Sequence, residues 1–498
     1  MKDRFLRLFA LLGTLFALGM SVGEHSLAAG MNVETDVLMR HAPSSIATTK
    51  ADPKLEDWED PDICGGCHER QVKGWKGSMH SISFKDPIFQ AEWALAEKAT
   101  GGKLMNLCGG CHTPVGVLTN SVKFDPSLGK HGGFTTEGVA EKGVFCDVCH
   151  TVSDTTHTKA PYGSPGNASI VLSPGQTKYG PLKDAKSPYH QTAYSELHTK
   201  AEFCGNCHNI FHPSNKFPIE HTYDEWKASP YAQNGIVCQD CHMVPVDTAI
   251  RVANEMTRPK DLKEHGLGGF AGIGAEQERG LVHDHGFVGG NSVVAPLLGV
   301  EGAEEHRADA IKRLQSAAEL EMTAKPTDDR GTYQLKVKVI NARAGHQLPT
   351  SLTFIRQIWL EILVTDSHGK EIYRSGVLGD DNRLPPETVV FRNHSVDEHG
   401  KPTLNPWEIA RFDELNTIPP KGYRYGTYYF NLPSLDERFT VTARLNYQSY
   451  DQGFVDKLLG KDKLQVPVVN MKSLIRSFDR RGLPVALHDG TRVKVAGK

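Results

Sequence analysis

The sequence predicts a multidomain α+β protein, in which a mainly helical, loop-rich N-terminal half precedes one helix and a C-terminal β-sandwich. The 498 residues exceed what one hydrophobic core usually serves, so about two or three domains are expected. All ten cysteines lie between residues 64 and 241, a stretch with many Gly and Pro loop signals. After Thr332, apolar and polar residues alternate with the period of two that is typical of strands.

The first residues have the pattern of an export signal. Lys2, Arg4 and Arg7 precede an apolar stretch over residues 8–20, which is shorter than the ~20 residues that a membrane-spanning helix needs. Small residues follow, so we expect a signal peptide over residues 1–29 and a linker over residues 30–60. No transmembrane span is expected in the mature chain. The predicted location is the periplasm, with the outer cell surface or the extracellular space as alternatives.

Composition excludes one class of function and raises a question about the interior. The 56 Lys and Arg residues nearly balance the 59 Asp and Glu residues, for a net charge of −3, whereas nucleic-acid binders are usually basic. No nucleic-acid partner is therefore expected. The apolar share of 39% is below the roughly 45–50% that is usual when Gly is also counted. Something other than side chains is therefore expected to fill part of the core.

The ten cysteines form five pairs with one spacing. Two residues separate the members of each pair, and a histidine follows the second member directly. The five sets are Cys64, Cys67 and His68; Cys108, Cys111 and His112; Cys146, Cys149 and His150; Cys204, Cys207 and His208; and Cys238, Cys241 and His242. This C-x-x-C-H pattern is the attachment signature of c-type haem.

The chemistry of haem c explains the spacing. Two thiols three positions apart lie on one helical turn and can bond one porphyrin, while the adjacent histidine supplies the proximal nitrogen to the iron. Disulfides are the first alternative in an oxidising compartment, and zinc sites and redox C-x-x-C motifs are the others. None of these requires a histidine after every pair, and five pairs cannot be divided into zinc sites of two pairs each. The sequence therefore predicts five covalently bound haem c groups with their iron.

Each iron has a sixth position, for which neutral imidazole is the expected ligand. Ten histidines besides the five proximal ones lie between Cys64 and His285, against six in the 213 residues that follow. If residues 68–80 are helical, His80 is about 18 Å from His68, so we expect it to bind a neighbouring haem. His190 and His198 are expected on one face of a helix that leads into Cys204. The distal candidates are His80, His190, His198, His285, His212 and His346.

The remaining periodicity divides the chain. Helical spacing of apolar residues over 304–322 predicts a bridging helix over residues 301–325. Alternation over residues 333–339, 358–364 and 439–447 predicts the β-sandwich, over residues 326–470, with a tail over residues 471–498. The haem domain is expected over residues 61–300. The sandwich has no cysteine and no acid–base constellation, so it is expected to be structural or to serve as a docking surface.

Several motifs support a resemblance to a known family. The string Cys64-Gly-Gly-Cys67-His68 followed by Trp75-x-x-Ser78-x-His80 resembles multihaem cytochromes c of the class that includes the tetrahaem electron acceptor of hydroxylamine oxidoreductase. The motifs at residues 195–208 and 238–243 are similar to the same group, and residues 345–360 resemble a C-terminal β domain of some members. The resemblance implies bis-histidine haems that carry electrons. Five motifs in place of four is a departure from that class.

Three functions follow from these patterns. The leading interpretation is an electron carrier with redox proteins as partners, for which no catalytic residue is predicted. The second is an oxidoreductase that acts on a small nitrogen or sulfur compound at one five-coordinate haem. The third is a structural or filament-forming conductive cytochrome. Contact with a membrane or cell surface, and oligomer formation, are compatible with each.

The haem prediction is tested by counting. We expect a pyridine haemochrome assay to give five haems c per chain. A value below five would contradict the interpretation of at least one C-x-x-C-H motif.

Overall fold

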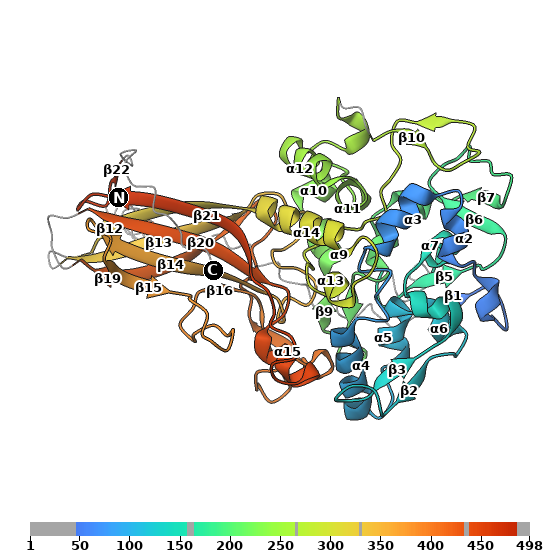
Figure 1. Ribbon diagram of the computed structural model, residues 1–498, viewed down its shortest axis with the longest axis horizontal. Coiled ribbons are helices and arrows are strands. Elements are labelled where there is room, and N and C mark those ends of the chain that lie inside the picture. The colour runs from blue at the N-terminus through green and yellow to red at the C-terminus, as the bar shows by residue number, and fades with distance from the viewer. Residues whose placement is uncertain (1–45, 157–163, 264–266, 328–330, 433–437, 486–498) are drawn as a thin grey trace, which may run out of the picture.

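The structure is a computed structural model that describes residues 46–156, 164–263, 267–327, 331–432 and 438–485. The first half is built mainly from short helices and loops, and the second mainly from long strands (Figure 1). This agrees with the predicted α+β class. The expected signal peptide lies outside the described residues, as do most of the expected linker and the end of the expected tail.

Most of the helices are short. In chain order they are α2 (Pro61–Gly65), α3 (Glu69–Lys76), α4 (Pro87–Thr100), α5 (Met105–His112), α6 (Pro114–Leu118), α7 (Cys146–His150), α8 (Glu202–Gly205), α9 (Thr222–Lys227), α10 (Pro230–Gln233), α11 (Gln239–His242), α12 (Val246–Glu255), α13 (Val294–Leu298), α14 (Ala303–Ala317) and α15 (Gln452–Leu459). Short 3-10 helices are η1 (Leu55–Asp57), η2 (Gly138–Lys142), η3 (Glu196–Thr199), η4 (Pro259–Asp261) and η5 (Pro406–Glu408).

Each C-x-x-C-H motif contains a helical turn. In three motifs the backbone N–H of the histidine donates to the carbonyl of the first cysteine, at 2.8 Å for His68, 2.9 Å for His208 and 2.9 Å for His242. Helices α5 and α7 contain the other two motifs whole. Because residues three and four apart lie on one side of a helix, both thiols and the imidazole of a motif face the same region.

Helix α4 is well delimited by its sequence. The Asp86 carboxylate accepts hydrogen bonds from the backbone N–H groups of Ile88 and Phe89, and Pro87 occupies the first turn. At the other end, Gly101 has a φ of 66°, a left-handed conformation that suits glycine. These caps fix the helix that carries Phe89 towards the second cysteine motif.

Small sheets join the loops around the motifs. Strands β1 (Ala47–Thr48), β5 (Ile170–Leu172) and β4 (Val152–Thr155) form a three-stranded sheet. The two-stranded sheets pair β2 (Lys123–Asp125) with β3 (Gly133–Thr135), β6 (Thr177–Gly180) with β7 (Gln191–Tyr194), β8 (Ile210–Phe211) with β9 (Pro218–Glu220), β10 (Gly269–Phe270) with β11 (Glu278–Arg279), and β17 (His394–Val396) with β18 (Arg411–Glu414).

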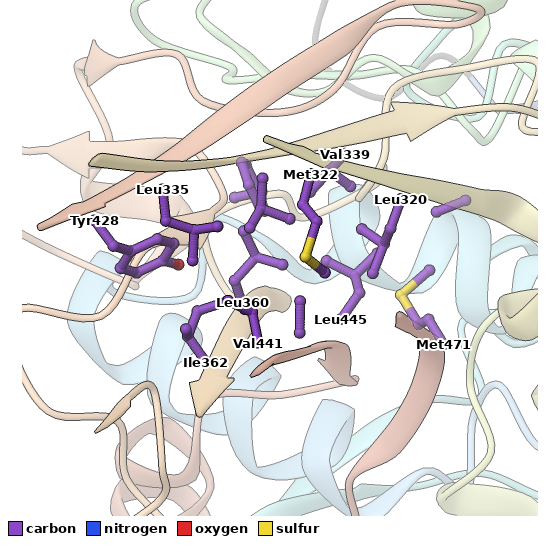
Figure 2. Packing of buried hydrophobic residues seen from close by; sticks show 14 of the residues in the cluster. Leu320, Met322, Leu335, Val339, Leu360, Ile362, Tyr428, Val441, Leu445 and Met471 are labelled. Carbon is purple, nitrogen blue, oxygen red and sulfur yellow. The ribbon is translucent and has the colours of Figure 1, made fainter. Parts of the chain in front are cut away.

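Two antiparallel sheets form the C-terminal part. One has the order β12 (Ala318–Pro326), β13 (Thr332–Asn341) and β19 (Tyr423–Asn431). The other has the order β15 (Glu371–Ser375), β14 (Gln357–Asp366), β20 (Phe439–Gln448), β21 (Val469–Phe478) and β22 (Pro484–Val485), and β16 (Val390–Phe391) also pairs with β14. Figure 2 shows that side chains of both sheets, such as Leu335, Ile362 and Val441, pack in one core. The apolar residues that alternate along the sequence therefore form the buried face of each strand.

Three elements differ from the expectation. The predicted bridging helix ends at Ala317, and residues 318–326 form strand β12, because alternate residues pack against β13. Residues 190–198 are not a helix but contain strand β7, which pairs in parallel with β6, followed by η3. Strand β21 extends into the predicted tail. β12 and β7 each pair with a neighbouring strand, which outweighs local helical propensity, and β21 extends the sheet beside β20.

The two halves of the molecule share a hydrophobic core. Ile82, Ile88 and Val294 from the first half pack in one cluster with Phe354 and Phe454 from the second. The C-terminal part therefore supports the region around the cysteine motifs directly. None of the helices in the described ranges is long and apolar enough to cross a membrane.

The shared core of the two sheets can be tested with a matched pair of substitutions in the six-stranded sheet. Ile362 is 0% exposed and Ile475 is 53% exposed. Ile362→Ala is expected to lower the free energy of opening of β14 and β20 by about 2–5 kcal/mol, because it leaves a cavity. Ile475→Ala should change it by less than about 0.5 kcal/mol. Hydrogen–deuterium exchange of the strand amides measures both, and equal effects would contradict the assigned faces.

Candidate functional site

One cavity collects the chemistry-bearing residues of the first half. Its volume is about 1150 Å³, and all ten cysteines and the five histidines that follow them line it. This exceeds the roughly 300–1,000 Å³ that is usual for one small-molecule site. The C-terminal part contributes walls, among them His346, Arg356 and Tyr447. The cavity is therefore of a size for several large groups and is formed by both halves of the chain.

Six of the ten cysteines meet in pairs that join different motifs. The sulfur of Cys64 interacts with that of Cys146, the sulfur of Cys204 with that of Cys238, and the sulfur of Cys207 with that of Cys111. Within the described ranges, no three or more His, Cys, Asp and Glu side chains are grouped so that they could hold a metal ion by themselves. The motifs therefore adjoin one another while each keeps its own two thiols.

The histidine of each motif is oriented through its Nδ1 atom. In four motifs this nitrogen faces a backbone carbonyl, so the Nδ1–H donates and Nε2 is left as the metal-binding atom. The pairs are His68 with Ala271 at 2.8 Å, His112 with Ser83 at 2.9 Å, His150 with Tyr179 at 2.7 Å and His242 with Val288 at 2.8 Å. This is the arrangement expected of proximal haem ligands.

His208 differs from the other four because its Nδ1 faces a carboxylate. The Nδ1 atom lies 3.4 Å from Oε1 of Glu220, which is 7% exposed. Burial lowers the pKa of His208, but Glu220 opposes this and raises the pKa to about 9. A positive charge on this imidazole is therefore stabilised, which none of the four carbonyl contacts does to the same extent.

Four histidines lie opposite four of the motif histidines. Two metal–nitrogen bonds of about 2.0–2.1 Å, with ~1.1 Å from each nitrogen to its ring centre, separate two axial imidazoles by about 6.2–6.4 Å. The ring centroids of the observed pairs are 6.4 Å apart for His68 and His190, 6.2 Å for His80 and His208, 6.3 Å for His150 and His285, and 6.2 Å for His242 and His346. These residues thus fit an iron held between each two rings.

His198 also lies near His150, at 5.9 Å between centroids. Its Nε2 atom is hydrogen-bonded to the Cys149 carbonyl at 3.0 Å. The Nδ1 of His285 instead contacts the His283 carbonyl at 3.1 Å, which leaves Nε2 of His285 available. The structure therefore favours His285 over His198 as the partner of His150.

Of the other candidates, the structure does not bring His212 to a motif histidine. Its Nε2 contacts the Trp407 carbonyl at 3.0 Å, and its Nδ1 accepts from the backbone N–H groups of Ser214 and Asn215. Both ring nitrogens are occupied, so His212 does not fit the distal role predicted for it. It instead joins the first half to a loop of the second.

The histidine of the second motif has an aromatic neighbour. His112 stacks on Phe89 with ring centroids 3.5 Å apart and planes at 5°. In the part of the chain that the structure describes, no second histidine ring is paired with His112. The second motif is therefore unlike the other four.

Burial favours the neutral form of four imidazoles that line the cavity, which is the form that binds metals. Burial lowers the pKa of His80, His242 and His285 to about 3 in each case, and that of His112 to about 4. Neighbouring positive groups add to the effect, such as Arg313 beside His242. At neutral pH these rings can therefore bind iron without first losing a proton.

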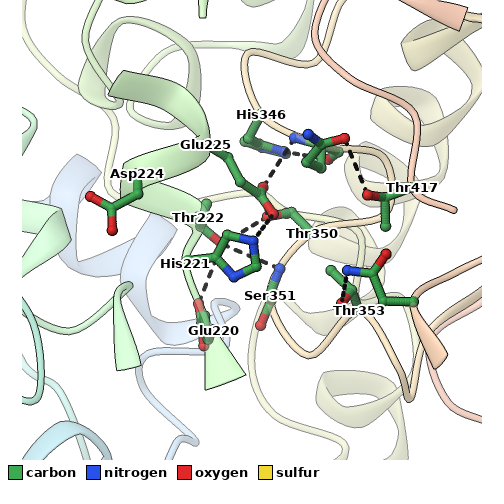
Figure 3. Close-up of polar contacts among 12 residues, drawn as sticks. Glu220, His221, Thr222, Asp224, Glu225, His346, Thr350, Ser351, Thr353 and Thr417 are labelled. Atoms are coloured by element: carbon green, nitrogen blue, oxygen red, sulfur yellow. Dashed lines mark hydrogen bonds and ion pairs between the residues drawn. The ribbon is translucent and has the colours of Figure 1, made fainter. Parts of the chain in front are cut away.

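Figure 3 shows how the loop that carries His346 is held. The Glu225 carboxylate accepts from the backbone N–H of Gln347 at 3.0 Å and from the Thr350 hydroxyl at 2.5 Å. Its other oxygen is 3.4 Å from Nε2 of His221. Glu220 and Glu225 lie near His221 in sequence, but they belong to no motif that would predict a role for them. Their contacts can be assigned only once the structure places the loop at residues 346–351 beside them.

Glu225 leads to a test of pH dependence. Burial raises its pKa to about 8, against about 4.3 in an unfolded chain. Between these values the folded state keeps a proton that the unfolded state has lost, so the free energy of unfolding falls as pH rises, by up to about 1.4 kcal/mol per pH unit. Glu225→Gln removes this loss, and the variant should gain stability relative to the native chain from about pH 5 to pH 8.

Urea unfolding across that pH range measures the difference. Glu276→Gln, which removes an exposed carboxylate, serves as the control and should follow the native chain. Parallel curves for Glu225→Gln and the native chain would contradict a buried, neutral Glu225.

Two comparisons place this geometry among known proteins. Residues 63–151, which include the first three cysteine motifs, match the model of the family described as cytochrome c554 and c-prime. The crystal structure of a penta-heme cytochrome c552 from Thermochromatium tepidum is similar in fold, with a TM-score of 0.55 and 16% identity over 85% of this chain and 99% of that chain. No curated protein matches the sequence.

Two further solved structures, one of them an ApaA protein from Bordetella pertussis, each match 32% of this chain with a TM-score of 0.15 and do not share its overall fold. The family match over the first motifs and the shared fold over most of the chain are consistent with the cavity and its histidine pairs. Both similarities are to c-type cytochromes, the class that the C-x-x-C-H motifs predict.

Proposed function

We propose that the chain is an exported cytochrome that relays electrons through five covalently bound haem c groups, one at each C-x-x-C-H motif. The observation that carries this proposal is the set of four histidine pairs at 6.2–6.4 Å across one cavity. An iron with two imidazole ligands has no open position, so it exchanges electrons and does not bind a substrate. The four motif histidines would be proximal, and His190, His80, His285 and His346 distal.

The pairing crosses between motifs, as expected for His80. This residue follows the first motif in sequence but lies opposite His208 of the fourth. His346 lies in the C-terminal part and completes the fifth motif. Neither half of the chain can therefore assemble all the sites alone, which gives the C-terminal β domain a part in haem ligation beyond support.

The thiol contacts supply an order for the relay. The first motif adjoins the third through Cys64 and Cys146, and the fourth adjoins both the second and the fifth. Cys149 of the third motif lies close enough to Cys204 and Cys207 to act on them electrostatically. Because the thiols tether porphyrin edges, adjacent thiols place haem edges side by side. The fourth site is then a junction between three neighbours.

The second motif favours a second candidate function. His112 has Phe89 as its ring partner, so its haem would keep an open axial position among the described residues. One turn further along α4, Oε1 of Glu92 is buried and has no hydrogen-bond partner, and the residue lines the same cavity. Burial raises the pKa of Glu92 to about 8, so the carboxyl carries a proton at neutral pH. This site is suited to an oxidoreductase that acts on a small nitrogen or sulfur compound.

Electron paramagnetic resonance tests the ligand assignment. The oxidised protein should show four low-spin haems and one high-spin haem. His80→Ala removes one imidazole and should convert one further haem to high spin, whereas His212→Ala, whose ring nitrogens are used by the protein, should leave the spectrum unchanged. An unchanged spectrum for His80→Ala would overturn the pairing with His208.

Carbon monoxide separates the two candidate functions, because it needs an open position on ferrous iron. We expect one of five haems to bind it in the reduced native protein. Five low-spin haems and no binding would exclude the oxidoreductase at the second motif and leave the relay intact. Binding at several haems would contradict the relay as described.

A further inference from the structure

We propose that Glu220 and Arg313 set opposite potentials on two adjoining haem sites, so that the His80–His208 site is the lower and the His242–His346 site the higher in potential. The inference rests on the proposed relay and gives it a direction at this step. Neither Glu220 nor Arg313 binds the iron. Each acts through the histidine ligands, whose environment sets the potential of the site.

Glu220 acts on the His208 site. It ends strand β9, and its Oε1 lies 3.4 Å from Nδ1 of His208 while also accepting from the Thr222 hydroxyl at 3.4 Å. The other four motif histidines contact backbone carbonyls at this atom. Ferric iron carries one positive charge more than ferrous iron, so a carboxylate behind the ligand stabilises the ferric state. The potential of this site is thereby lowered.

One cation weakens this effect without cancelling it. The buried guanidinium of Arg356 interacts electrostatically with Glu220. Its Nε, however, donates to the Thr350 carbonyl at 3.1 Å and one Nη donates to the Ser449 carbonyl at 3.4 Å. The guanidinium is thus held by backbone oxygens, and no ion pair between it and Glu220 replaces the contact with His208.

Arg313 acts on the His242 site. It lies on α14 and lines the cavity, and one Nη donates at 2.9 Å to the carbonyl of Cys241, the residue before His242. Its Nε is buried and has no partner. The guanidinium is close enough to act electrostatically on both His242 and His346. A cation beside both ligands favours the ferrous state, which raises the potential of this site.

The other charges around this site leave the sign unchanged. Asp240, two residues before His242, is held by Arg258 through two hydrogen bonds of 2.7 and 3.1 Å. Lys421 lies near Cys241 and donates to the carbonyls of Ala253 and Ala342. Asp240 is therefore paired. Asp309, one turn earlier on α14, acts electrostatically on Arg313 but more strongly on Lys312. Arg313 and Lys421 are hydrogen-bonded to neutral carbonyls.

The two sites adjoin, so the difference acts on one step. Cys204 and Cys238 interact with each other and would tether the porphyrins of these two sites. With haem bound, one electron would pass from a ferrous site held by His80 and His208 to a ferric site held by His242 and His346. The first iron would be oxidised and the second reduced, with no proton or further reactant required. The charges make this direction downhill.

Redox titration of the holoprotein, followed by the low-spin resonances, tests the inference. The two sites are identified as those whose signals are lost in His80→Ala and in His346→Ala. Glu220→Gln should increase the equilibrium constant for reduction of the His80–His208 site by about tenfold. For one electron this raises the potential of that site by about 59 mV. Arg313→Gln should lower the second potential by a similar factor.

Three further variants separate charge from structure. Asp224→Asn and Lys312→Gln each remove a charge next to the same elements without contacting a ligand, and they should leave both potentials in place. Glu220→Asp keeps the charge and should restore most of the native potential. All variants should keep their low-spin signals, because no iron ligand is changed.

The inference fails if Glu220→Gln and Arg313→Gln leave the two potentials unmoved, or if the controls shift them equally. In that event the relay still stands provided that the four low-spin haems are present. Loss of the low-spin signals themselves in the native protein would instead contradict the relay.

Discussion

The helical turn that joins each cysteine pair to its histidine is the interaction on which the rest of the structure depends. A backbone hydrogen bond from the histidine to the first cysteine, or a helix over the whole motif, turns both thiols and the imidazole to one side. Repeated five times in less than 200 residues, this turn directs the reactive side chains into one cavity of about 1150 Å³. The loops and two-stranded sheets of the first half connect these helical turns to one another.

The C-terminal part is more than a support for this cavity. Its two sheets have a core of their own, and a second cluster joins Phe354 and Phe454 to the first half. The loop that follows β13 carries His346, which Glu225 fixes through the backbone of Gln347 and the hydroxyl of Thr350. The ligand geometry at the fifth motif therefore depends on contacts between halves that are more than 100 residues apart.

Charge placement distinguishes sites that are chemically alike. Four motif histidines contact backbone carbonyls, whereas His208 contacts Glu220, and Arg313 lies beside both His242 and His346. His112 stacks on Phe89 and is the site at which the second proposed function would place small-molecule chemistry. Under these proposals, identical motifs would provide environments that favour different oxidation states and different uses of the iron.

The sequence by itself determined the cysteine motifs, the haem chemistry they indicate and the alternation of the long strands, because each depends on residues only a few positions apart. It also indicated that His80 would serve a neighbouring site, since a helical rise carries it too far from His68. Only the tertiary structure places His285 and His198 beside His150, His346 beside His242, and His212 against the Trp407 carbonyl. The strand at residues 191–194 and the strand after Ala317 depend on pairing with the neighbouring strands β6 and β13. The histidine pairs are made by contacts between segments far apart in the chain, and the strands by pairing with another segment, so local spacing carries no signal for either.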